Sequence, residues 1–131
     1  MNKRWKRFEG RPNRITKSEP GVTLNHKGVF LLNAKAFAAL DEPAAVEFVY
    51  DEDERTIGIV ATDPARLNAF PVIKKETKRI TSFRLINGSP FCKEFGIKVA
   101  TTIRFNQVDL DNEGVLMLPL KYAVQTGRGI Y

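Results

Sequence analysis

The chain has 131 residues, of which 43% are hydrophobic, 27% charged and 10% aromatic, and its formal net charge is +6. This balance predicts a folded protein with a hydrophobic core and excludes a disordered, collagen-like or multidomain chain. Cys92 is the only cysteine, so no internal disulfide can form, and no apolar run approaches the ~20 residues that cross a bilayer. We therefore expect a cytoplasmic protein without membrane contact.

Charged residues occur in three blocks along the chain. Residues 1–20 hold seven basic side chains against two acidic ones, residues 41–63 hold eight acids against one base, and residues 66–104 hold nine bases against two acids. Blocks of opposite sign create surface fields that attract a polyanion to the basic areas and repel it from the acidic one. The charge pattern therefore favours a nucleic-acid partner.

The first half, after a flexible basic arm, reads as strand, strand, helix and hairpin. Short apolar runs bounded by turn residues predict the strands, and apolar residues three and four positions apart predict the helix, which Asn33 can cap. The acidic residues 51–54 suit a solvated hairpin turn and lack the glycine and ligand spacing of a calcium loop. The elements expected are strands at 22–24 and 29–32, a helix at 34–40, and hairpin strands at 46–50 and 56–61.

The second half repeats this order in a looser form. A helix is expected to start near Ser89, which can cap it, with Pro90 in its first turn and Gly96 as its stop. A basic connector at residues 66–79 can add a strand at 69–73. The other elements expected are a strand at 80–86 and a second hairpin formed by residues 101–106 and 115–120 around a turn at 111–114.

Each unit is too small to bury a sheet face alone, so we expect the two to share one core. The predicted fold is mainly β (α+β): two strand–helix–β-hairpin units, about 22–63 and 80–120, share a barrel-like core in one domain at 21–124. A basic arm at 1–20 precedes the domain and a loose tail at 125–131 follows it. The pattern leaves open whether the units pair within one chain, as a pseudo-dimer, or between two chains, as a homodimer.

Residues 27–40, which read KGVFLLNAKAFAAL and are followed by the acidic hairpin, resemble a unit of the AbrB/MazE/SpoVT-like swapped-hairpin family. Gly28 matches the turn glycine of that unit, Leu32 its strand end, Lys35 a basic residue near the helix start, and Leu40 the helix end. Asn33 stands where the family usually has proline. Over residues 28–61, the resemblance implies a small bacterial DNA-binding regulator or antitoxin built from paired β–α–β–β units, with Lys27 and Lys35 as DNA contacts.

The residues themselves also point to nucleic acid. Lysine and arginine can neutralise phosphates, and Trp5 in the arm can stack on an exposed base. Alternatively, the arm is a solvated tail, and the lysines at 74–79 only protect a sheet edge from pairing with another chain. The candidate nucleic-acid-binding residues are Lys3, Arg4, Trp5, Lys6, Arg7, Arg11, Arg14, Lys27, Lys35, Lys74, Lys75, Lys78, Arg79 and Arg84.

No catalytic motif emerges, so we expect neither an enzyme nor a metal or other cofactor. His26 is the only histidine, and Cys92 is expected to be a buried core thiol, not a nucleophile. The sequence favours a small nucleic-acid-binding protein, with DNA as the first choice and transcriptional regulation as the process that the family resemblance implies. The arm and residues 74–84 would contact phosphates while the acidic hairpin faces away. The alternative is a structural or protein-interaction module that binds an acidic partner.

Overall fold

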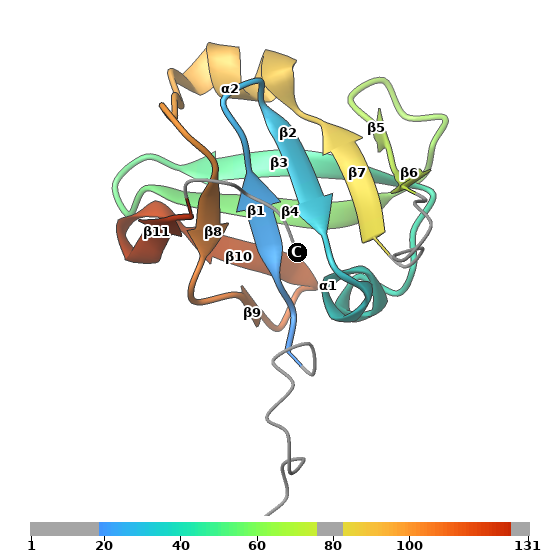
Figure 1. Ribbon diagram of the computed structural model, residues 1–131. Coiled ribbons are helices and arrows are strands. Elements are labelled where there is room, and N and C mark those ends of the chain that lie inside the picture. Colours follow the sequence, from blue (N-terminus) through green and yellow to red (C-terminus); the bar gives the residue numbers. More distant parts are fainter. Residues whose placement is uncertain (1–18, 76–82, 127–131) are drawn as a thin grey trace, which may run out of the picture.

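The computed structural model describes residues 19–75 and 83–126, which form two antiparallel sheets and two short helices (Figure 1). In spatial order, the six-stranded sheet comprises β11 (Ala123–Gln125), β8 (Ile103–Phe105), β1 (Val22–Leu24), β2 (Val29–Leu32), β7 (Phe83–Asn87) and β6 (Ile73–Lys75). The five-stranded sheet comprises β5 (Phe70–Pro71), β3 (Ala45–Asp51), β4 (Thr56–Thr62), β10 (Val115–Pro119) and β9 (Asp109–Leu110). The helices are α1 (Ala34–Ala39) and α2 (Ser89–Phe95), and a 3-10 turn, η2 (Leu120–Tyr122), precedes β11.

The two sheets pack as layers, with the strands of one running across those of the other (Figure 1). Each sheet has two open edges, so the described strands do not close into a barrel. The mainly β prediction is confirmed, and the barrel-like arrangement is replaced by two open sheets. In Figure 1, α2 lies above the six-stranded sheet and α1 below it, next to the lower end of β2.

Turn and cap residues determine the first elements. The side-chain oxygen of Asn25 accepts hydrogen bonds from the backbone N–H groups of Lys27 and Val29 at 2.9 and 3.0 Å, and Gly28 has a φ of 84°, so the chain reverses between β1 and β2. The Asn33 side chain accepts the N–H of Ala36 at 2.9 Å and thereby starts α1. The predicted strands at 22–24 and 29–32 and the Asn33 cap are confirmed.

Three strand pairs join the first half of the chain to the second, and the pairing of β1 with β8 is one of them. β2 pairs with β7 in the six-stranded sheet, and β4 pairs with β10 in the five-stranded sheet, both antiparallel. Each of these strands also belongs to a hairpin, so the β1–β2 and β6–β7 hairpins lie side by side in one sheet and the β3–β4 and β9–β10 hairpins in the other. The four strands of each such hairpin pair are therefore arranged symmetrically, while β8 and β11 extend the six-stranded sheet, and β5 the five-stranded sheet, on one side only.

One hydrophobic cluster lies between the sheets and takes buried residues from both halves of the chain. An aromatic group packs against it: the ring of the partly buried Phe48 lies 4.9 Å from that of Phe30, 4.9 Å from that of Phe70 and 4.7 Å from that of Phe91, centroid to centroid. Such tilted, edge-on and stacked pairs add to the stabilisation from burial. Phe48 comes from β3 and Phe91 from α2, so these ring contacts join the helix to the five-stranded sheet.

Several predictions from the second half are wrong. Residues 103–105 and 115–119 form strands but not a hairpin with one another: β8 pairs with β1 and β11, while β10 pairs with β4 and β9. The turn at 111–114 is present, and it joins β9 to β10. Ser89 is the first residue of α2 and not its cap, since Gly88 occupies that position without a side-chain hydrogen bond. Gln125, expected in the loose tail, ends β11.

Candidate nucleic-acid interface

Lys74 and Arg84 lie directly opposite each other on neighbouring strands. They are register partners in the β6–β7 pair, and Arg84 is also the partner of Leu32 in β2. Because side chains alternate across a sheet, partners in register project from the same face. The structure therefore brings these two candidate cations together at the end of the sheet next to α1.

The Arg84 side chain is held by an aromatic ring. Its guanidinium carbon lies 4.3 Å from the centre of the Phe37 ring in α1, and Nη1 donates a 3.3 Å hydrogen bond to the carbonyl of Phe83. A guanidinium on a ring face is stabilised by cation–π attraction without loss of its positive charge. Arg84 is thus a positioned cation with no ion-pair partner among the described carboxylates, and Lys74 beside it is exposed.

Lys35 lies on α1 near these two residues but does not share their face. It is exposed and precedes Phe37 by two positions, which is about 200° around a helix. Because Phe37 contacts Arg84, the Lys35 side chain points away from that contact. We define the basic corner as Lys74 and Arg84, with Lys35 at its flank.

Lys27 lies at the other end of β2, in the turn that packs against α2. The backbone N–H of Gly88 donates a 2.9 Å hydrogen bond to the carbonyl of Gly28, which places this turn beside the start of α2. Lys93 and Lys98 lie near Lys27 around a cavity at that end. These two lysines were absent from the predicted site, because only the β2–β7 pairing brings them next to the turn.

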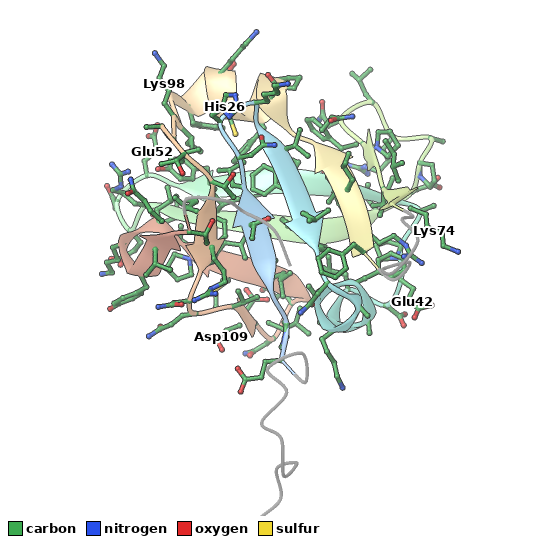
Figure 2. The ribbon with its side chains drawn as sticks, in the orientation of Figure 1. His26, Glu42, Glu52, Lys74, Lys98 and Asp109 are labelled. Carbon is green, nitrogen blue, oxygen red and sulfur yellow. The ribbon has the colours of Figure 1, made fainter. Side chains whose placement is uncertain are left out.

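The acidic turn between β3 and β4 is remote from the basic corner. β3 pairs with β5 at Ala45 and reaches Asp51 six residues later, a distance of ~20 Å at about 3.3 Å per residue. Figure 2 shows Glu52 on the left of the molecule and Lys74 on the right. Within the turn, the N–H of Glu54 donates a 3.1 Å hydrogen bond to the Asp51 carboxylate, and Lys121 forms an exposed 3.8 Å ion pair with Glu54.

Arg66, from the second basic block, is neutralised by a carboxylate. Its Nε lies 2.7 Å from Oε2 of Glu47, which also accepts a 2.8 Å hydrogen bond from the Thr62 hydroxyl. The hydrogen bond from Thr62 and then that from Arg66 hold the pKa of Glu47 below its ordinary value. Arg66 therefore adds little to the positive field of the corner.

The other candidates fall outside what the structure describes. Lys75 is described only as a backbone position in β6. The remaining members are in residues 1–18 and 76–82, outside the described residues: Lys3, Arg4, Trp5, Lys6, Arg7, Arg11, Arg14, Lys78 and Arg79. Their roles stay predictions from the sequence.

No protein-family model, curated protein or solved structure matches this chain. The likeness of residues 28–61 to the swapped-hairpin family therefore stays a prediction from the residues alone. Over residues 19–75 and 83–126, no helix has the length and apolar character needed to span a membrane. Those same residues contain no group of three histidine, cysteine or acidic side chains that could hold a metal ion.

Proposed function

We propose that this protein binds nucleic acid through the basic corner, with the basic arm as a second contact. The observation that carries the proposal is the Lys74–Arg84 pair at one end of the molecule, with the acidic turn on the opposite side (Figure 2). Paired cations attract backbone phosphates, and the acids of the turn between β3 and β4 favour one orientation of a polyanion over the other. Duplex DNA is the first choice of ligand, because phosphate contacts require no unpaired bases.

The same proposal includes the organisation of the fold. We infer that the chain contains two copies of a hairpin–helix–hairpin unit, the first formed by β1, β2, α1, β3 and β4 and the second by β6, β7, α2, β9 and β10. The symmetric pairing about β2–β7 and β4–β10 supports this inference. A paired arrangement within one chain agrees with the AbrB-like resemblance and with a role as a DNA-binding regulator or antitoxin.

The salt dependence of binding tests the corner directly. Each phosphate contact lowers the slope of log K against log salt by about 0.9 on duplex DNA, so K74Q/R84Q should make the slope shallower by about two and weaken binding. K121Q removes the same kind of charge beside the acidic turn, and it should change neither the salt slope nor the affinity. R84K keeps the charge and should retain most of the slope. An unchanged slope in K74Q/R84Q, or an equal effect of K121Q, would contradict the proposal.

The alternative, an acidic protein partner, involves the same corner. Ile73 precedes Lys74 on the edge strand β6 and is 43% exposed, so this edge offers an apolar contact next to a charge. Purification of the native protein at low salt separates the two cases. Nucleic acid in the product supports the proposal, whereas a stoichiometric acidic protein without nucleic acid favours the alternative.

A further inference from the structure

A cavity of about 420 Å³ lies between the turn that joins β1 to β2 and the end of α2. Ligand sites commonly have volumes of roughly 300–1,000 Å³, so it is large enough for a small organic molecule. It lies at the opposite end of β2 from Lys35 and is therefore separate from the basic corner. His26 in the turn and Lys98 after α2 mark this end of the molecule in Figure 2.

Hydrogen bonds donated by backbone N–H groups hold both walls of the cavity. On one side, Asn25 ties the turn through its side-chain bonds to Lys27 and Val29, and the bond between Gly28 and Gly88 fixes the turn to the helix. On the other side, the N–H of Ile97 donates a 2.9 Å hydrogen bond to the carbonyl of Cys92, which closes the end of α2. The lining side chains therefore project from a preformed frame, which reduces the entropy that a ligand must overcome.

Positive charge surrounds this cavity. Lys27, Lys93 and Lys98 line it together with His26, and no carboxylate is among the described residues of the lining. None of the three lysines forms an ion pair with a described carboxylate. Glu94 is next to Lys93 in α2, but it does not line the cavity. Three lysines thus line the walls, and no described carboxylate compensates their charge.

The inner part of the cavity is apolar. Leu24 is 1% exposed and Cys92 is 6% exposed, and Ile97 and Val99 complete this part of the lining. Burial raises the pKa of the Cys92 thiol, so the thiol stays protonated and adds no negative charge. A ligand that fits both regions has an anionic group for the rim and a small apolar body for the interior.

We propose that this cavity binds a small phosphate monoester, with the phosphate among Lys27, Lys93 and Lys98 and the organic group against Leu24 and Cys92. A phosphate monoester carries a charge between about −1.5 and −2 at neutral pH. This charge balances the three positive lysines better than the single negative charge of a carboxylate does. Lysine contacts phosphate as a flexible point charge and so requires no planar, two-pronged ligand. This inference does not depend on the nucleic-acid proposal.

Titration of the full-length protein with phenyl phosphate, followed through its backbone amide resonances at constant ionic strength, tests the proposal. The expected shifts concentrate at the turn and at the end of α2. Phenyl phosphate should bind more tightly than inorganic phosphate, because only the ester places an apolar group on the interior surface. K27Q/K93Q/K98Q should weaken binding of the ester at least about tenfold, the usual effect of losing a charged hydrogen bond.

A matched variant controls for net charge. K35Q/K74Q/K121Q removes three lysines outside the cavity lining and should leave the affinity for phenyl phosphate within about twofold, since distant exposed charges are screened. An equal loss in both triple variants, or the absence of localised shifts, would overturn the proposal. A short DNA duplex provides the third comparison. If the duplex shifts these amides and phenyl phosphate does not, the cavity belongs to a nucleic-acid site and the small-molecule proposal is wrong.

Discussion

Replacing Gly28 with alanine tests the contact between the first hairpin and α2. Gly28 has a φ of 84°, and a Cβ added there would lie 2.7 Å from the Cα of Ser89 and 3.1 Å from its backbone nitrogen. Both neighbours are backbone atoms, so they cannot move aside as the end of a long side chain can. The substitution therefore adds a steric cost to the ordinary cost of placing alanine in the left-handed region.

Gly114 provides the matched control. Its φ is 83°, but a Cβ added there would meet nothing within 4 Å. G114A should cost only the backbone term, about 1–2 kcal/mol of unfolding free energy. G28A should cost that amount plus about 1–3 kcal/mol of overpacking, or roughly 2–5 kcal/mol in total.

Urea denaturation of the two variants and the wild type measures the difference. The transition midpoint of G28A should fall well below that of G114A, while the m-values remain similar because both variants unfold the same surface. Equal destabilisation would refute the close packing of Gly28 against Ser89. It would also contradict the position of this turn as one wall of the cavity.

Two further substitutions probe the first half of the fold. N33A should lower the free energy of unfolding by about 1–2 kcal/mol, because the side chain accepts the N–H groups of Gly21 and Ala36, whereas N33D keeps the acceptor and should cost less in the same urea assay. Glu47 has a lowered pKa in the folded protein, so its stabilisation is present above the ordinary carboxyl pKa and is lost as the pH falls through the lowered value. Wild type should therefore lose more stability than E47Q between about pH 6 and about pH 3, and parallel pH profiles would contradict this role.

Local elements follow closely from residue types. Asn33 starts a helix because its side chain replaces a missing backbone partner, and Gly28 permits the reversal between two short apolar runs. In β3, Val46 is fully buried and Val49 is 49% exposed, as the alternation predicts. For the cap and the turn, the decisive interaction lies within a few residues of the signal.

The sequence does not indicate in the same way which distant strands pair with one another. Ile103 and Phe105 are buried as their alternation indicates, yet their strand joins β1 instead of the predicted partner. Alternation determines which side chains face a core, but not which of two sheets takes the strand. The proximity of Lys27 to Lys93 and Lys98 has the same origin, because it depends on β2 pairing with β7.

The most direct test of the nucleic-acid proposal is the affinity of the full-length wild-type protein for a random DNA duplex across a range of salt concentrations. The separation of the basic corner from the acidic turn predicts measurable binding at low salt. Its log K should fall linearly with log salt, with a slope of about −2 or steeper from Lys74 and Arg84 together with the arm. No binding at low salt, or an affinity that salt does not change, would contradict the proposed function.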